Sequence, residues 1–189
     1  MREGRKGLAS AILVLACAAS APIAAAAGSF DACSLLTSAE IRAVQGRPVE
    51  STKASQPERG RFAVSQCFYT LAPFSKSISL EVTRPRPGEK ERPRDYWKQL
   101  FARAGRKETD RDRETKSPEK EEGEKRSSPP RRVRAVGDDA YWVGPPIVGS
   151  LYVLAGDSYL RISVGGPDME EVKIAKLSRL ARKAVRRLR

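Results

Sequence analysis

The clearest pattern of apolar and β-forming residues lies near the C-terminal end of the chain, on either side of Gly156-Asp157. Two runs, 151–155 and 158–164, flank this dipeptide. Glycine in the first central position is typical of a two-residue type II′ turn, so the pattern predicts a β-hairpin. Pairing through that turn places four aliphatic side chains on one face, which we expect to be the core face. These four are Leu151, Val153, Leu160 and Ile162.

The opposite face of the predicted hairpin is mixed in character. It carries Tyr152, Leu154, Tyr159 and Arg161. If a helix covers these side chains, the domain is a sandwich and its function lies elsewhere. If they are exposed, they form a candidate binding face, because an apolar patch with tyrosine and arginine is typical of recognition surfaces.

Two further strands are predicted upstream, at 63–70 and 77–83. In the second of these, Ile78, Leu80 and Val82 alternate with polar residues in strict period two. Such a strand has one buried and one polar face, which favours an antiparallel sheet over a parallel sheet buried on both sides.

Three helices are predicted from apolar spacing and end signals. The first begins at Thr37, which can form a capping box with Glu40, and ends by Gly46. The second covers 94–104, where aromatic residues share one helical face and are expected to pack. The third follows Pro167-Asp168 and is amphipathic, with an apolar arc that most simply covers the sheet.

Together these elements predict one α+β domain over 28–189. We expect an antiparallel sheet of about five or six strands, packed by helices in a sandwich-like arrangement. Within this domain, 105–132 contains no aliphatic or aromatic residue. It is predicted to be a disordered charged loop, and its near-balanced charge argues against a nucleic-acid-binding arm.

Residues 1–27 have the pattern of a secretory signal peptide: a basic start, a short apolar run and small residues before the expected cleavage point. The sequence therefore predicts an exported protein, periplasmic or secreted. In an alternative interpretation, residues 14–17 form a lipobox, and a lipidated Cys17 anchors the mature chain to a membrane.

The cysteines agree with export. Cys33 and Cys67 would remain as an even pair after cleavage, and in an oxidising compartment they are expected to form a disulfide. On the chain-entropy model, closing this loop stabilises the fold by about 3–4 kcal/mol. A redox or metal pair is the less favoured alternative, since neither a CxxC spacing nor a histidine accompanies the two cysteines.

The chain is strongly basic, with a formal net charge of +13. Much of the excess lies in 84–104 and 168–189. The last predicted helix has a basic arc opposite its apolar arc, and its candidate contacts to an anionic surface are Lys176, Arg179, Lys183, Arg186 and Arg187. A solvated face is the plain interpretation. Salt-sensitive adsorption to an anionic envelope surface is the alternative, and nucleic acid is not expected as a partner of an exported chain.

Catalytic options are narrow because the chain contains no histidine and no asparagine. Arrangements of the Ser-His or Cys-His type and histidine metal ligands are therefore excluded, and we predict no metal site and no cofactor. Asp138 and Asp139 are the one adjacent acid pair in the predicted folded region outside the helices. They could act as a general acid and base, but aspartate after glycine at a strand start is also ordinary turn chemistry.

Four short strings, at 31–37, 66–69, 136–142 and 151–157, carry a family resemblance. The first is Asp-Ala-Cys-Ser-Leu-Leu-Thr, and the second contains Cys67. The chain resembles a family of exported bacterial proteins and lipoproteins of unknown function that open with Asp-x-Cys-x-Leu-Leu-Thr and have a second cysteine. The resemblance implies an α+β domain with one disulfide, similar to the PsbP-like fold, and supplies no catalytic residues.

These observations predict a non-catalytic, exported binding or interaction module of the cell envelope, whose partner is an envelope protein or polymer. One alternative is an envelope hydrolase that uses Asp138 and Asp139. Another is a basic protein that adsorbs to anionic envelope polymers or to an anionic membrane surface.

Overall fold

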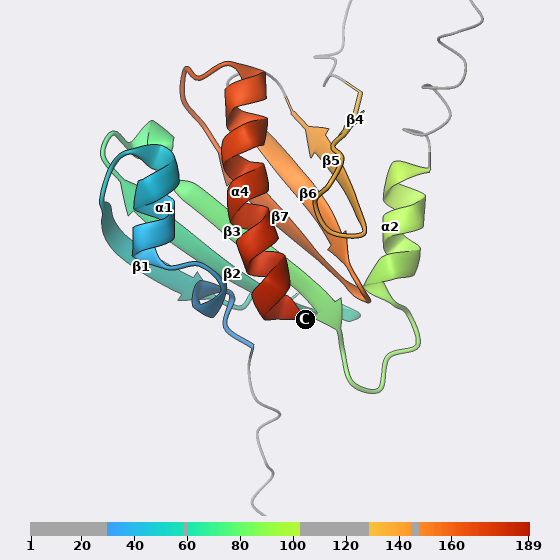
Figure 1. Cartoon of the computed structure of the whole chain (residues 1–189). Helices are drawn as coiled ribbons and strands as arrows, with labels where there is room; N and C mark the ends of the chain where they lie inside the picture. Colours follow the sequence, from blue (N-terminus) through green and yellow to red (C-terminus); the bar gives the residue numbers. More distant parts are fainter. Residues whose placement is uncertain (1–29, 59, 103–128, 145–147) are drawn as a thin grey trace, which may run out of the picture.

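The computed structural model of the chain describes residues 30–58, 60–102, 129–144 and 148–189 (Figure 1). Its centre is one seven-stranded sheet with the order β1-β2-β3-β7-β6-β5-β4, in which every neighbouring pair is antiparallel. The strands are β1 (Val49–Ser55), β2 (Phe62–Leu71), β3 (Ile78–Pro85), β4 (Arg131–Arg132), β5 (Asp139–Val143), β6 (Gly149–Ala155) and β7 (Ser158–Val164).

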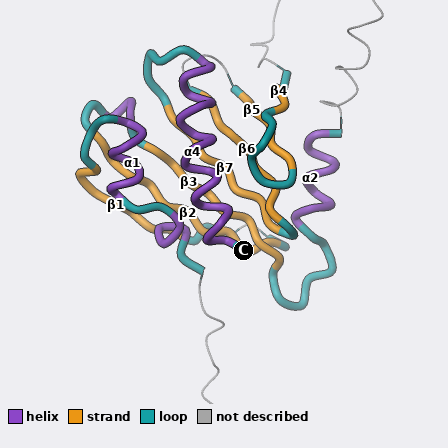
Figure 2. Tube along the Cα trace, in the orientation of Figure 1, coloured by secondary structure: helices purple, strands orange, loops and turns teal. Residues whose placement is uncertain are grey.

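Helices flank this sheet (Figure 2), and two separate core clusters show that they pack on both of its faces. They are the short 3₁₀ helices η1 (Ala32–Leu35) and η2 (Phe74–Lys76) and the α-helices α1 (Ser38–Gln45), α2 (Pro93–Phe101) and α4 (Glu170–Leu188). The predicted α+β class with an antiparallel sheet is confirmed, although the sheet has seven strands where five or six were expected. Among the described residues, no helix is both long and apolar enough to cross a membrane.

The predicted hairpin is formed by β6 and β7, in the expected register. Val153 pairs with Leu160 across the two strands, and Ala155 pairs with Ser158 next to the turn. Gly156 has a φ of 61°, a conformation that glycine adopts without the steric cost of a side chain. The four predicted core residues of the hairpin are fully buried.

One face of the sheet, here called the inner face, packs against η1, α1 and α4 (Figure 1). The apolar arc of α4 contributes Ile174, Leu177 and Ala181, among others, to an aliphatic core shared with the strands. Ile41 of α1 belongs to the same core. The long last helix therefore covers the sheet, as its periodicity predicts.

The other face, the outer face, is partly covered by α2. Trp97 and Phe101 of this helix form a second cluster with Tyr141, Leu154 and Tyr159 of the sheet. Aromatic packing of the second helix is thus confirmed. The last residue of the helix is Phe101, so the helix ends before the predicted position 104.

Two strands do not follow from the apolar pattern. β1 is an edge strand whose residues are mostly exposed, so it has no buried period-two face that would reveal it. β4 lies inside the stretch predicted to be disordered, and Arg131 and Arg132 pair with β5. The predicted loop therefore extends too far at its C-terminal end. Its remainder up to 128 and the predicted signal peptide, with Cys17, lie outside the described residues.

Candidate functional site

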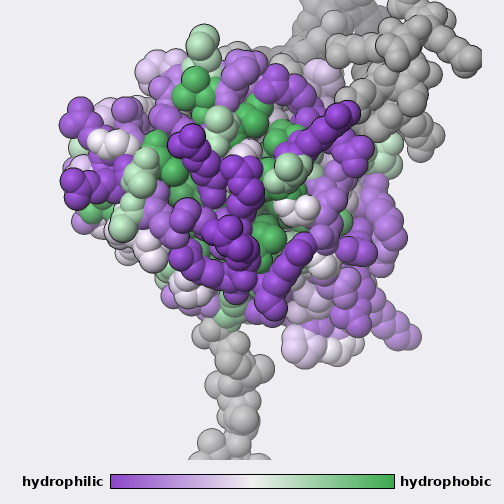
Figure 3. All heavy atoms as spheres, in the orientation of Figure 1, coloured by the Kyte–Doolittle hydropathy of each residue, from purple (hydrophilic) through white to green (hydrophobic). Residues whose placement is uncertain are grey.

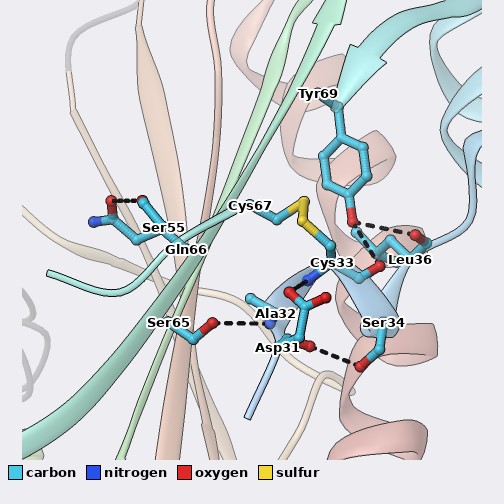
Figure 4. The surroundings of a disulfide bond; sticks show 10 residues. All are labelled: Asp31, Ala32, Cys33, Ser34, Leu36, Ser55, Ser65, Gln66, Cys67 and Tyr69. Carbon is cyan, nitrogen blue, oxygen red and sulfur yellow. Dashed lines mark hydrogen bonds between the residues drawn. A yellow bond between two sulfur atoms is a disulfide. The ribbon is translucent and has the colours of Figure 1, made fainter. Parts of the chain in front are cut away.

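The disulfide Cys33–Cys67 joins η1 to β2, with 5.0 Å between the two Cα atoms (Figure 4). Hydrogen bonds hold the same junction. The Ala32 amide donates to the Ser65 hydroxyl at 2.9 Å, and the Tyr69 hydroxyl donates to the Leu36 carbonyl at 3.1 Å. The disulfide prediction is confirmed, and the cross-link fixes the point on the sheet from which α1 starts.

α1 has the end signals that its sequence predicts. The Glu40 amide donates to the Thr37 hydroxyl at 3.2 Å, and the Thr37 amide donates to the Glu40 carboxylate at 3.0 Å. At the other end, Gly46 adopts a φ of 71° and its amide donates to the Arg42 carbonyl. The capping box orients the Glu40 carboxylate as well as starting the helix.

That carboxylate is the anchor between α1 and α4. Arg187 donates to both Glu40 oxygens, at 2.7 and 2.8 Å, and Lys183 donates to one of them at 3.1 Å. Arg187 also donates to the Leu35 carbonyl at 2.7 Å. Bidentate pairing of this kind is stronger and more directional than a single ion pair. We call these three side chains, Glu40, Lys183 and Arg187, the Glu40 clamp.

The Glu40 clamp shifts the protonation equilibrium of its carboxyl group. The hydrogen bond from Arg187 is the main cause that lowers the pKa of Glu40 well below its ordinary range, with the Thr37 amide and Lys183 acting in the same direction. Burial opposes this shift but is outweighed. The carboxylate therefore stays ionised at any ordinary pH, and the two helices stay linked.

Beside the clamp, α1 and α4 border a groove of about 450 Å³. Its α4 side presents Arg179, Arg182, Lys183 and Arg186, and its α1 side presents Ala39, Glu40, Ala43 and Val44. Three of the cations, Arg179, Arg182 and Arg186, are exposed and form no hydrogen bond or ion pair with another residue in the described part of the chain. We call this feature the α1–α4 groove.

The structure divides the five cations predicted to contact an anionic surface into two groups. Lys176 pairs with Asp168 at 2.6 Å, while Lys183 and Arg187 pair with Glu40. Arg179 and Arg186 line the groove and pair with no carboxylate of the described residues. Arg182 joins them. Arg182 belongs to the basic arc that the sequence predicts. Helical periodicity identifies this arc, but it does not show which of its cations form ion pairs within the protein.

The hairpin residues Tyr152, Leu154, Tyr159 and Arg161 lie on the outer face. Leu154 and Tyr159 are only 7% and 8% exposed, because α2 packs over them. Trp97 lies 6.0 Å from Tyr159 between ring centroids, and Phe101 lies 5.7 Å from Tyr152. Burial also raises the pKa of the Tyr159 hydroxyl. Of the two alternatives for this face, coverage by a helix therefore applies to Leu154 and Tyr159, and these two side chains cannot form an exposed binding face.

Arg161 and Tyr152 are half-buried members of a polar row across the outer face. Gln66, Glu81, Arg161 and Tyr152 pair in order across β2, β3, β7 and β6. The Gln66 amide donates to the Glu81 carboxylate, and Glu81 is buried. This row has the geometry of an internal polar network at the edge of the α2 contact.

Asp138 and Asp139 are both engaged by structural donors. Asp138 accepts from the Gly156 amide at 2.7 Å and from Arg94 at 3.3 Å, and Arg189 also pairs with it. Asp139 accepts from the Trp97 indole at 3.3 Å and from Arg132 at 3.2 Å. The two carboxylates thus connect the β6–β7 turn, α2, β4 and Arg189 through partners that lie elsewhere in the chain.

In the described residues, no group of three or more histidine, cysteine, aspartate or glutamate side chains could hold a metal ion. No family model, curated protein or solved structure matches this chain. The family resemblance drawn from its short motifs accordingly stays a prediction.

Proposed function

We propose that this protein is an exported, non-catalytic binding module of the cell envelope, and that it binds an anionic ligand in the α1–α4 groove. One observation carries the proposal. Arg179, Arg182 and Arg186 project into one groove without an internal partner, whereas the neighbouring cations Lys176, Lys183 and Arg187 are each held by a carboxylate.

The spacing of the groove cations suits an extended anion. Positions 179, 182, 183 and 186 follow one another at helical intervals of three, one and three residues. They therefore form one stripe, about 10 Å long at 1.5 Å per residue. Guanidinium groups present a planar fork of donors that matches phosphate or carboxylate oxygens. Small side chains on the α1 side, Ala39 and Ala43, leave room for a ligand to approach this stripe.

The groove is also pre-formed. The Glu40 clamp fixes the distance between the two helices, and the disulfide fixes the start of α1 on the sheet. A ligand would order only the three arginine side chains and not the backbone, which limits the entropy lost on binding.

Export is part of the proposal and has two supports. The first 27 residues have the pattern of a secretory signal peptide. In addition, the two remaining cysteines form a disulfide, which persists in oxidising compartments. An envelope polymer or lipid that carries phosphate or carboxylate groups is the class of ligand that such a protein meets there.

A hydrolase that uses Asp138 and Asp139 is not proposed. Each carboxylate already accepts from two or more donors that hold the fold together. Releasing either one for proton transfer would detach the donors that hold α2 or the β6–β7 turn.

The test is binding of a short-chain polyphosphate to the full chain, measured by isothermal titration calorimetry at low salt. The variant Arg179→Gln/Arg182→Gln/Arg186→Gln should bind at least about tenfold more weakly, because each charge-assisted hydrogen bond contributes about 1.5–3 kcal/mol before screening. Binding by the unchanged protein should also weaken as salt is raised.

The matched control is Arg47→Gln/Lys53→Gln/Lys90→Gln. It removes the same three charges from exposed positions that lie outside the groove. If the control loses as much affinity as the groove variant, net charge alone drives binding and the proposed site is wrong. If the unchanged protein does not bind polyphosphate at all, the proposal fails as a whole.

A further inference from the structure

We infer that the anionic ligand is a lipid surface, and that the protein contacts it along the exposed stripe of α4. This inference rests on the proposed function, because it names the ligand class of the same groove. It adds two contact residues that the groove does not include, Met169 and Val172.

The first argument is the composition of the exposed stripe. Val172, Ala175, Arg179, Arg182 and Arg186 are all exposed. At 100° per residue they lie within about 60° of Arg179 around the helix axis. The stripe thus begins with apolar side chains and continues with cations. Because the opposite arc of α4 fills the inner core, this stripe faces away from the sheet.

The second argument is the exposure of large apolar side chains at the start of α4. Met169 is 70% exposed and Val172 is 38% exposed. A soluble anionic polymer would need only the cations, whereas a lipid surface offers phosphates beside an apolar layer. Figure 3 shows hydrophilic residues gathered over α4 on this face, with hydrophobic surface between and beside them.

The third argument concerns the acidic residues near this apolar start, which would otherwise repel an anionic surface. Asp168 pairs with Lys176, and Arg131 pairs with Glu170 at 3.3 Å and with Glu171 at 3.2 Å. The pairing with Lys176 lowers the pKa of Asp168. The negative charges of this end are therefore largely compensated within the protein, and the three groove arginines dominate the field along the stripe.

Other exposed apolar residues provide a control for this orientation. Phe74 is exposed in η2, and Leu100 is 42% exposed in α2, the helix on the outer face. The ring of Phe74 lies 5.7 Å from the ring of Phe68 of β2, tilted by 39°. The register of β2 places Phe68 on the outer face of the sheet, opposite Ser79. Both exposed residues, Phe74 and Leu100, belong to the outer-face side of the sheet, whereas the groove cations lie on α4 over the inner face, so they should contribute little if α4 lies along the lipid surface.

The experiment is co-sedimentation of the full chain with vesicles of phosphatidylcholine alone and of phosphatidylcholine with phosphatidylglycerol. We expect binding to the mixed vesicles, little binding to the neutral ones, and release at high salt. Arg179→Gln/Arg182→Gln/Arg186→Gln should weaken binding about 100-fold, from about fivefold for each basic residue near an anionic surface.

A second variant separates a lipid surface from a soluble polymer. Met169→Gln/Val172→Thr removes exposed apolar surface at nearly constant shape, and should weaken binding to mixed vesicles about tenfold while leaving polyphosphate binding unchanged. Phe74→Gln/Leu100→Gln is the matched control and should bind vesicles like the unchanged protein. Urea unfolding of each variant checks that the fold is kept.

Four results would overturn the inference, the last of them together with the proposed function. Binding to polyphosphate without binding to mixed vesicles would leave the proposed function standing and reject a lipid surface. Equal binding to neutral and anionic vesicles would reject the role of the cations. A loss in the Phe74/Leu100 variant with none in the Met169/Val172 variant would place the lipid contact elsewhere. Failure to bind either probe would reject both proposals.

Discussion

The two faces of the sheet are covered in different ways. The inner face carries a continuous aliphatic core under α4 and α1, and this layer is also cross-linked by the disulfide and by the Glu40 clamp. The outer face carries a smaller, mainly aromatic cluster under α2, which ends at a half-buried polar row.

This difference has a functional consequence. Helices that are held by packing, a covalent bond and ion pairs can present side chains at fixed positions, which suits a pre-formed binding groove. α2 is attached chiefly through a few rings and through hydrogen bonds to Asp138 and Asp139. We therefore propose that the ligand binds at the inner layer, whereas the outer layer covers the second face of the sheet.

The hairpin permits a direct comparison of the two faces, because Leu160 lies on the inner face and Leu154 on the outer face. Leu160→Ala should lower the free energy of unfolding by about 4 kcal/mol, since the site is fully enclosed by the aliphatic core. Leu154→Ala should cost about 2 kcal/mol, because the cluster under α2 is small. Urea unfolding measures both, and a larger loss for Leu154 would show that the outer face is the main core.

Removal of the disulfide tests the cross-link of the inner layer. Cys33→Ser/Cys67→Ser should lower the free energy of unfolding by about 3 kcal/mol, because the unfolded chain gains the freedom of the opened loop. Hydrogen exchange should become faster in α1, which starts from the cross-linked segment, and change less in α2. Equal acceleration in both helices would mean that the two layers unfold together rather than separately.

The Glu40 clamp predicts a pH dependence of smaller size. Because its pKa is lowered in the folded state, the ionised carboxylate stabilises the fold above the ordinary glutamate pKa, and this contribution is lost as the pH falls toward the lowered value. Glu40→Gln should therefore cost about 2 kcal/mol at pH 7. The difference from the unchanged protein should shrink between about pH 5 and pH 2. A difference that is constant over this range would indicate lost packing instead of lost charge.

Much of the inner layer could be predicted from local sequence signals. Gly156 sets the turn of the hairpin, and the strict alternation around Leu80 identifies a central strand. Thr37, Glu40 and Gly46 mark both ends of α1. These signals work because turn conformation, helix capping and side-chain periodicity depend on residues a few positions apart.

The edge strands could not be predicted in this way. β1 has no buried face of its own, and β4 consists of two arginines inside a charged stretch. Both exist because a neighbouring strand offers hydrogen-bonding groups, and those neighbours are placed by the rest of the fold.

The candidate site shows the same division between sequence and tertiary structure. The sequence by itself determined that α4 has a basic arc, that the two cysteines can pair, and that the hairpin has one core face. Only the tertiary structure decided that Glu40 pairs with Lys183 and Arg187, whereas Arg179, Arg182 and Arg186 have no partner in the described part of the chain. It also decided that α2 covers Leu154 and Tyr159. The physical reason is that helical and strand periodicity is local, whereas ion pairing and burial depend on partners far apart in the chain, such as Glu40 and Arg187.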